Sequence, residues 1–280
     1  MENVVRYTVF GSKGYVGSHL AKHLQTLPGV EVLCDSMPLP KDCLGHVFYC
    51  IGVTTDFKTR LHDTMRAHVC KAQEILAERS FQSFTYLSST RVYEGATTGA
   101  EDCSVIANPS NMDDFYKISK LAGEAICLTD PRSTIRVVRL SNVLGMENPP
   151  LTFVPSIIRE AIDNGEIVLK SALNSAKDYI LIEDVVRMLP KIARGGESRI
   201  YNLASGQQIE HLRIVEKLCA SLGCTYRVTS SAPRAEFPNV EILRLVSEFE
   251  FMAQSIMDGL VQLCGEYRKV AKMDEIGELS

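Results

Sequence analysis

The chain has 280 residues, of which 45% are hydrophobic and 23% charged, and its net charge is −4. This suits one large α/β domain, or one domain with a smaller lobe, of ordinary globular composition. The charge gives no support for a nucleic-acid or membrane-surface partner, and no apolar run reaches the roughly 18 residues of a membrane span.

The nine cysteines are an odd number and include no C-x-x-C pair. Several lie inside predicted strands or helices, Cys50 and Cys127 among them. The N-terminal stretch enters a predicted strand at once and leaves no room for a signal peptide. We therefore expect buried free thiols in the cytoplasm and no metal site, because disulfides persist in oxidising compartments.

A glycine-rich loop follows the first predicted strand. Its sequence is G-S-K-G-Y-V-G, and a segment with helical spacing comes next. In such a unit Gly11 permits a tight turn, Gly14 lets the backbone approach a pyrophosphate, and Gly17 allows helix and strand to pack closely. The helix N-terminus at Tyr15 and Val16 offers free N–H groups to phosphates. The loop predicts a dinucleotide site, with an ordinary glycine turn as the alternative.

Two residues bear on which dinucleotide binds. Asp35 follows the second predicted strand, 24 residues after Gly11. A carboxylate there can accept hydrogen bonds from ribose hydroxyls, which favours NAD. The alternative is an aspartate that only forms a turn with Ser36. Lys13, inside the loop, can instead pair with a 2′-phosphate, so NADP is not excluded.

Strands and helices alternate along the first half of the chain. The expected strands are 4–10, 30–33, 47–51, 84–87 and 135–140, and the expected helices begin at Val16, run over 58–78 and run over 116–128. This alternation predicts a parallel sheet covered by helices on both faces. Ligands bind such sheets at the carboxyl ends of the strands. The residues at those ends are Gly11, Asp35, Gly52, Ser88, Ser89 and Asn142.

The pattern changes after Gly145. The expected elements are then a helix over 154–164, strands over 167–169 and 179–182, a helix over 183–193 interrupted by Pro190, a strand over 200–203 and a helix over 209–222. We therefore predict a dinucleotide-binding domain over residues 1–150 and a smaller α+β lobe over 151–280, with some later segments returning to the first domain.

The residues with a specific chemistry are Ser89, Tyr116 and Lys120. Tyr116 and Lys120 are four apart on a predicted helix and share a face. A nearby ammonium lowers the pKa of a tyrosine hydroxyl from its usual ~10, so that the phenol can exchange a proton with a substrate hydroxyl or carbonyl. Ser89 can hydrogen-bond the same oxygen. Y-x-x-x-K alone is weak evidence, because most such pairs are ordinary surface or core-edge residues.

Several segments occur together in the order and spacing of the extended short-chain dehydrogenase/reductases. They are the glycine loop, Y-L-S-S-T-R-V-Y at 86–93, Y-K-I-S-K-L-A-G-E at 116–124, R-L-S-N-V-L-G at 139–145, K-D-Y-I-L-I-E-D-V at 177–185 and I-Y-N-L-A-S-G at 200–206. The chain resembles this family, which includes nucleotide-sugar epimerases, dehydratases and reductases, over nearly its whole length.

The resemblance implies a Rossmann-type, doubly wound parallel sheet that binds NAD(P), with a smaller C-terminal α+β lobe for the substrate. It assigns catalysis to Ser89, Tyr116 and Lys120. By the same matching, Tyr116 and Lys120 also contact the cofactor.

Three further residues match substrate-binding positions of the family. Asn142 and the catalytic Ser89 would hydrogen-bond the substrate. Lys177, where the family usually has an arginine, and Arg234 would lie near the nucleotide phosphates, because charge-assisted contacts suit a diphosphate. Without the resemblance, Lys177 and Arg234 are equally well explained as solvated surface charges.

The sequence also departs from the family. Thr90 and Arg91 stand where sugar 4,6-dehydratases have an Asp-Glu pair, so elimination of water lacks its proton shuttle and a dehydratase is disfavoured. His68 replaces an asparagine common in relatives, and we expect it to be packed rather than in the site. The stretch between Asp35 and Val47 is short for the family, so we expect a helix and a strand to be reduced or missing, which weakens Asp35 as a cofactor ligand.

These observations favour a nucleotide-sugar epimerase that transiently oxidises a sugar hydroxyl with a tightly held NAD. The alternative with the same residues is a keto-sugar reductase that consumes NAD(P)H, which Lys13 would suit. An alternative of another class is a dinucleotide-binding sensor or scaffold without turnover. The intact set of Ser89, Tyr116 and Lys120 argues against this alternative. By analogy with relatives, the helices over 58–78 and 113–128 would form a homodimer contact.

Overall fold

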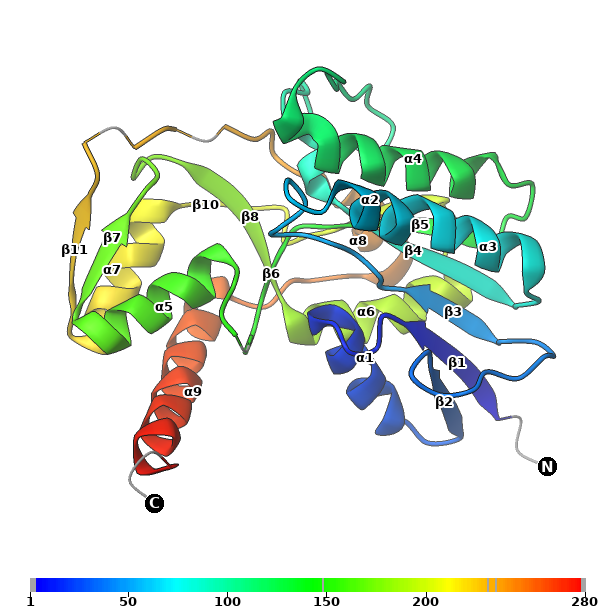
Figure 1. Cartoon of the computed structure of the whole chain (residues 1–280), viewed down its shortest axis with the longest axis horizontal. Coiled ribbons are helices and arrows are strands. Elements are labelled where there is room, and N and C mark those ends of the chain that lie inside the picture. Colours follow the sequence, from blue (N-terminus) through cyan, green and yellow to red (C-terminus); the bar gives the residue numbers. More distant parts are fainter. Residues whose placement is uncertain (1–3, 148, 231, 235, 278–280) are drawn as a thin grey trace.

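The computed structural model describes residues 4–277 except 148, 231 and 235. Within those residues, no helix is both long and apolar enough to cross a membrane. At the centre is a six-stranded parallel sheet with helices on both faces, as predicted (Figure 1). Its strands lie in the order β2 (Val30–Cys34), β1 (Val5–Phe10), β3 (His46–Tyr49), β4 (Ser83–Ser89), β5 (Ile135–Leu140) and β9 (Ile200–Leu203).

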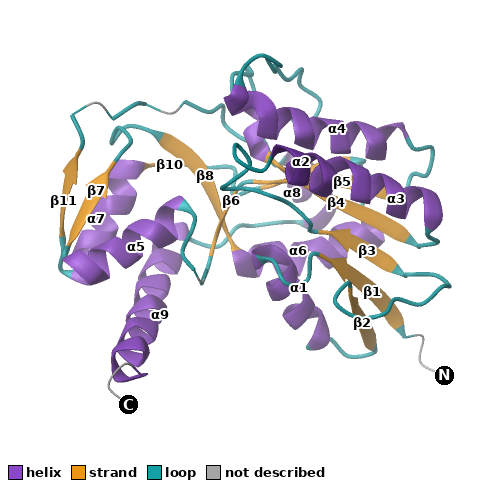
Figure 2. Ribbon diagram, in the orientation of Figure 1, coloured by secondary structure: helices purple, strands orange, loops and turns teal. Residues whose placement is uncertain are grey.

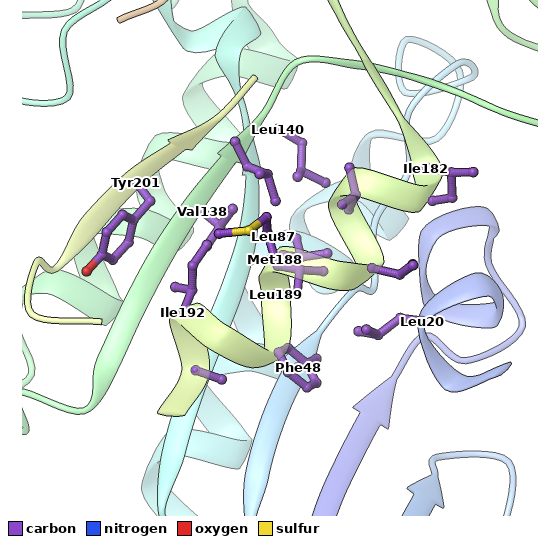
Figure 3. Packing of buried hydrophobic residues seen from close by; sticks show 14 of the residues in the cluster. Leu20, Phe48, Leu87, Val138, Leu140, Ile182, Met188, Leu189, Ile192 and Tyr201 are labelled. Atoms are coloured by element: carbon purple, nitrogen blue, oxygen red, sulfur yellow. The ribbon is translucent and has the colours of Figure 1, made fainter. Parts of the chain in front are cut away.

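Helices α1 (Tyr15–Gln25) and α6 (Ile182–Gly195) cover one face of this sheet. Apolar side chains fill the space between α6 and the strands (Figure 3). Those in the close-up include Met188, Leu189 and Ile192 from α6, and Phe48, Leu87, Val138 and Leu140 from the strands.

Helix α6 runs through Pro190, so the expected interruption at this residue is wrong. A proline inside a helix removes one backbone hydrogen bond and costs about 3 kcal/mol. Burial of the apolar helix face offsets this cost. Leu189 and Ile192 are both 0% exposed, and burying one such side chain contributes about 1.5–3 kcal/mol. Packing against the sheet therefore outweighs the local preference of proline.

The opposite face of the sheet is covered by α2 (Leu61–Met65), α3 (Lys71–Glu78) and α4 (Phe115–Thr129) (Figures 1 and 2). A π-helical turn, Arg66–Cys70, joins α2 to α3. The helix expected over 58–78 is therefore present, but it contains a wider turn that the apolar spacing did not predict.

Residues 35–45, between β2 and β3, form turns and bends without a helix or a strand. Strand β2 pairs with β1 on one side and is the edge of the sheet. The expectation that the short connection removes a helix and a strand is confirmed.

The remaining elements surround a second hydrophobic core. They are β6 (Asn142–Leu144), β7 (Glu166–Leu169), β8 (Ala176–Leu181), β10 (Gln208–Glu210) and β11 (Thr225–Val228), with α5 (Phe153–Asn164), α7 (His211–Leu222) and α9 (Ile256–Gly277). Strand β8 pairs with β6 in parallel and with β10 in antiparallel orientation, and β7 pairs with β11 in parallel. Helix α8 (Leu243–Phe249) packs on the first core. Helices α6 and α8 and strand β9 therefore come after residue 150 in the sequence but belong to the first sheet. A domain boundary at residue 150 stays a prediction.

Replacing Leu189 by alanine should lower the free energy of unfolding by about 2–5 kcal/mol, because it empties a fully buried position under α6. The matched control is Leu243→Ala, at a leucine that is 70% exposed. We expect the control to change stability by less than about 0.5 kcal/mol. Urea unfolding followed by circular dichroism measures both. Equal losses in the two variants would contradict the packing described.

Candidate active site

The glycine loop turns sharply between β1 and α1. Gly11 has a φ of +80°, and its carbonyl accepts a hydrogen bond from Gly14 N at 2.9 Å. A Cβ on Gly17 would lie 2.2 Å from the Gly11 oxygen, so a side chain there requires the backbone to move. Gly14 is exposed and extended, with φ −77° and ψ 169°. A Cβ on Gly14 would meet that oxygen at 3.3 Å. The backbone is thus open toward a ligand at Gly14 and closed at Gly17.

Asp35 binds this loop directly. Its carboxylate accepts hydrogen bonds from Gly11 N at 2.7 Å, Ser12 N at 3.2 Å and Ser12 Oγ at 2.7 Å. The residue therefore does more than form a turn, because it ties the end of β2 to the loop. Both carboxylate oxygens are engaged, so a ribose hydroxyl would have to share them. The role of Asp35 as a cofactor ligand stays a prediction.

A hollow of about 410 Å³ lies beside Asp35 at the carboxyl ends of β1 and β3. Its lining includes the apolar side chains of Phe10, Leu39, Ile51 and Ile75. Ligand sites are typically concave and mostly apolar, with a few polar groups that fix orientation. The lining also carries the charged side chains of Asp35, Lys71, Glu74, Glu78 and Arg79, so this hollow is of mixed character, and the placement of an adenosine in it stays a prediction.

The other loop residues differ in orientation. Lys13 is exposed, and its pairing with a 2′-phosphate stays a prediction. Val16 packs against the first core, so only its backbone can contact a ligand. The Tyr15 hydroxyl would lie 2.6 Å from a Cβ on Gly145. This buried hydroxyl has no hydrogen-bond partner among the described residues, and such a group calls for a polar partner. Loop, helix N-terminus and hollow together fit a dinucleotide.

Tyr116 begins the first turn of α4 and is 5% exposed. Burial is the largest effect and leaves the pKa of its phenol raised, although a hydrogen bond with Ser89, the positive charge of Arg91 and a hydrogen bond with Thr54 each lower it. Three hydroxyl groups, from Tyr116, Ser89 and Thr54, therefore meet at the carboxyl ends of β3 and β4. This is an arrangement that can hold a substrate oxygen and move its proton.

Lys120 lies one helical turn after Tyr116, as the spacing predicts. Its Nζ donates to the Leu87 carbonyl at 3.0 Å and would lie 3.5 Å from a Cβ on Gly52. Burial lowers the pKa of Lys120 to about 8. The cation that lowers the pKa of the phenol in this structure is Arg91, and an effect of Lys120 on that pKa stays a prediction. Lys120 instead presents its ammonium beside Gly52, on the cofactor side.

His68, on the π-helical turn, is fully buried and joins α4 to the loop after β3. Its Nε2 accepts from Val53 N at 3.1 Å, which assigns the ring proton to Nδ1. Nδ1 then donates to Ser119 Oγ at 2.8 Å, and Ser119 Oγ donates to the Tyr116 carbonyl at 2.7 Å. Burial lowers the pKa of His68 to about 2, so the ring is neutral. The expectation of a packed histidine is confirmed.

Two of the residues expected to bind substrate, Asn142 and Lys177, lie on the second group of strands. Asn142 is exposed at the start of β6 and donates to the Asp178 carbonyl at 2.8 Å. Lys177, on β8, is partly buried, with Nζ 5.2 Å from the centre of the Phe237 ring. Burial lowers the pKa of Lys177, and the positive charge of Arg91 lowers it further. The two cations therefore lie within electrostatic reach of each other.

Arg234 is not brought to the catalytic residues by any contact in the described part of the chain. Its side chain is 57% exposed and pairs with Glu236 at 3.0 Å. Its phosphate-binding role stays a prediction from the resemblance.

Sequence reasoning missed Thr54 and did not place Arg91 in the site. Arg91 belongs to a 3-10 turn, Thr90–Tyr93, which is capped by Ser89, because the Ser89 hydroxyl accepts from Arg91 N at 3.2 Å. The S-S-x-R pattern after a strand is the sequence feature that could have indicated that Arg91 lies close to Ser89. No sequence feature marks Thr54.

A family model described as "NAD dependent epimerase/dehydratase family" matches residues 39–204, which is more than half of the chain. The chain belongs to this family. The enzyme class expected from the combined motifs is thus confirmed at the level of the family.

Known proteins and structures show the same relationship at low sequence identity. A dTDP-D-glucose 4,6-dehydratase from Dictyostelium discoideum is 24% identical over an alignment of 149 residues that covers 49% of this chain and 34% of that protein. The chain thus matches only about a third of that relative's length.

Solved structures resemble the chain over almost its whole length. MoeE5 with UDP-glucose and NAD has a TM-score of 0.76 at 22% identity, covering 95% of this chain and 99% of MoeE5. UDP-glucuronic acid 4-epimerase from Bacillus cereus, with UDP-glucuronic acid and NAD, has a TM-score of 0.79 at 17% identity, covering 95% and 100%. RMD from Pseudomonas aeruginosa, with NADPH, has a TM-score of 0.78 at 20% identity, covering 95% and 99%. At these identities the likeness confirms the fold.

Alanine at two loop glycines should separate stability from dinucleotide binding. Gly17→Ala should cost about 1–3 kcal/mol of unfolding free energy, because its Cβ meets a backbone oxygen. Gly14→Ala should change stability by less than about 1 kcal/mol, because its φ suits alanine. Its methyl group should nevertheless weaken NAD binding by about tenfold or more, since it occupies the face open to a pyrophosphate. Urea unfolding and NAD titration measure the two effects. Unchanged NAD affinity in Gly14→Ala would argue against the site.

The lowered pKa of Lys120 predicts a specific pH dependence of stability. The folded chain loses this proton near pH 8 and the unfolded chain near 10.5. Between these values the unfolded state binds more protons, so this residue makes stability rise with pH. We expect the unfolding free energy of the wild type to increase relative to Lys120→Met by roughly 3 kcal/mol over this interval. Urea unfolding of both proteins at several pH values measures it. Parallel curves would show that the ammonium is not desolvated.

Proposed function

We propose that this chain is an NAD(P)-dependent nucleotide-sugar epimerase that oxidises a sugar hydroxyl transiently. The observation that carries the proposal is the meeting of the Tyr116, Ser89 and Thr54 hydroxyls next to a loop that fits a dinucleotide. The complexes of MoeE5 and of the Bacillus cereus epimerase with NAD and sugar nucleotides support the same cofactor and substrate class here.

The reaction requires proton transfer at one sugar oxygen. Bound NAD supplies a hydride acceptor and later the hydride donor. Ser89 and Thr54 would orient the sugar hydroxyl, and Tyr116 would take its proton as the C–H bond breaks and a ketone forms. This step requires the phenol in its ionised form, which burial disfavours. Arg91 favours that ionised phenol by its charge. The keto sugar would then rotate in the site. Tyr116 would return the proton to the same oxygen, while the opposite face of the carbon accepts hydride.

The residues after Ser89 support an epimerase rather than a 4,6-dehydratase. Elimination of water from a keto sugar requires a group that removes a carbon-bound proton and another that protonates the leaving hydroxyl. Thr90 and Arg91 occupy that part of the site. A guanidinium stays protonated and accepts no proton, and a threonine hydroxyl is not a base at neutral pH.

A keto-sugar reductase is the second candidate. The observation that favours it is the exposed Lys13 in the glycine loop, which suits the 2′-phosphate of NADPH. The structure of RMD with NADPH shows that the same fold accommodates that cofactor in another protein. The two candidates differ in whether reduced cofactor is consumed.

The test incubates the purified chain with a panel of nucleotide sugars and no added cofactor. An epimerase converts one of them to its stereoisomer without a net change in the absorbance of the reduced nicotinamide. Strict dependence on stoichiometric NAD(P)H would rule out an epimerase in favour of the reductase.

Tyr116→Phe should lower turnover by about 10²–10⁴-fold, because it removes the proton-transfer group. It should leave the unfolding midpoint and dinucleotide binding nearly unchanged. Tyr226→Phe, at a tyrosine of β11 that is 36% exposed, is the matched control and should behave as the wild type. If Tyr116→Phe had no effect on any turnover, a non-catalytic dinucleotide-binding protein would be the better description.

A further inference from the structure

Arg91 places a positive charge beside the catalytic tyrosine. Its guanidinium carbon lies 5.3 Å from the centre of the Tyr116 ring and 5.2 Å from the centre of the Phe57 ring. Both distances are typical of cation–π contacts. Its backbone N–H is held by the Ser89 hydroxyl at 3.2 Å. The two rings and the backbone contact therefore fix the guanidinium close to the groups that would hold the reacting sugar oxygen.

The guanidinium of Arg91 retains hydrogen-bonding capacity. Its Nε lies 3.6 Å from Glu94 Oε2, too far for a hydrogen bond, and the side chain is 34% exposed. Neither Nη atom donates a hydrogen bond to any residue that the structure describes. In Arg139, by contrast, the same groups donate to Glu124 and to the Tyr93 hydroxyl. A guanidinium with free Nη atoms offers the planar pair of donors that a carboxylate accepts.

Lys177 adds a second positive charge. Arg91 and Lys177 affect each other electrostatically, and Glu94 is the carboxylate that acts on both of them. Asp114 also interacts with Arg91 electrostatically, but it forms an ion pair with Lys117 at 3.1 Å, so the balance around Arg91 and Lys177 is still positive. Burial lowers the pKa of Lys177, and an anionic ligand would raise it again. These charges suit a ligand that carries more than one negative group.

We propose that Arg91 binds a carboxylate on the sugar ring, so that the substrate is a nucleotide-linked uronic acid. This inference rests on the proposed function. MoeE5 has been solved with both UDP-glucose and UDP-glucuronic acid, so the fold alone does not choose between neutral and acidic sugars. The choice then falls to side chains at the sugar.

Position separates the roles of the two cations. Arg91 contacts Tyr116, where the sugar reacts, whereas Lys177 lies on β8 and belongs to the second group of elements. We therefore assign the charge on the sugar to Arg91 and the diphosphate to Lys177. A neutral hydroxymethyl group in place of the carboxylate would cover the guanidinium and leave it unpaired, which a polar site penalises strongly.

Matched acidic and neutral ligands test this assignment. The Tyr116→Phe variant, which blocks turnover, is prepared with NAD. The binding of each ligand to it is then measured by calorimetric titration. The ligands are UDP-glucuronate and UDP-glucose, GDP-mannuronate and GDP-mannose, and UDP and GDP alone. We expect the acid of one pair to bind at least about tenfold more tightly than its neutral partner.

Adding Arg91→Met removes the guanidinium and keeps a long apolar side chain between the two rings. It should weaken binding of the acid by roughly 10- to 100-fold, and change binding of the neutral sugar and of the free diphosphate by less than about threefold. Arg91→Lys keeps the charge without the planar donors and should fall between. Arg60→Met, at an exposed arginine paired with Asp56 and Asp63, is the matched control and should match the parent.

Two results would overturn the proposal. Equal losses for UDP or GDP alone and for the acid sugar would assign Arg91 to the diphosphate. If the parent bound the acid and neutral members of every pair equally well, no carboxylate would be recognised. Epimerisation of a neutral sugar would then leave the proposed function intact. Failure of every sugar nucleotide to bind would instead overturn the proposed function, and this inference with it.

Discussion

A buried ion pair between Glu124 on α4 and Arg139 on β5 fixes the helix that carries the reactive side chains. Its atoms approach to 2.6 Å, and the two side chains are 3% and 5% exposed. Breaking such a pair leaves an uncompensated buried charge, which typically costs about 3–5 kcal/mol. Tyr116, Lys120 and Glu124 recur every fourth residue and so lie on one face of α4. The contact that holds Glu124 to the sheet therefore also sets the direction of the phenol and the ammonium.

The remaining parts of the site are placed by the ends of the parallel strands. The loop after β1 carries the glycines, the loop after β3 carries Thr54, and β4 ends at Ser89. His68 connects two of these parts, because it binds Val53 on one side and, through Ser119, the backbone of Tyr116 on the other. The fold thus brings together groups that are distant in sequence, and each is held by a contact outside the reacting centre.

Local patterns predicted the sheet and most helices, because these depend on periodicity. The catalytic roles of Tyr116, Lys120 and Ser89 rest on the family resemblance and stay predictions. What the sequence did not reveal depends on contacts between distant segments. Pro190 continues a helix because the sheet buries that helix, and the pKa of the phenol responds to Arg91 because the turn after Ser89 folds back over α4. Likewise, both carboxylate oxygens of Asp35 accept hydrogen bonds from the glycine loop because β2 lies beside β1.

The π-helical turn Arg66–Cys70 restricts how the length of this chain can vary. A π turn accommodates one residue more than a regular α-helical turn. Deleting a residue here would restore a regular α-helical turn and leave α2 and α3 in their present orientation, but it would move the side chains within the turn. His68 would leave Val53 and Ser119, and the link between α4 and the loop after β3 would be lost. Related chains should therefore differ in length within connections such as residues 95–111, while the number of residues between β3 and α3 stays constant.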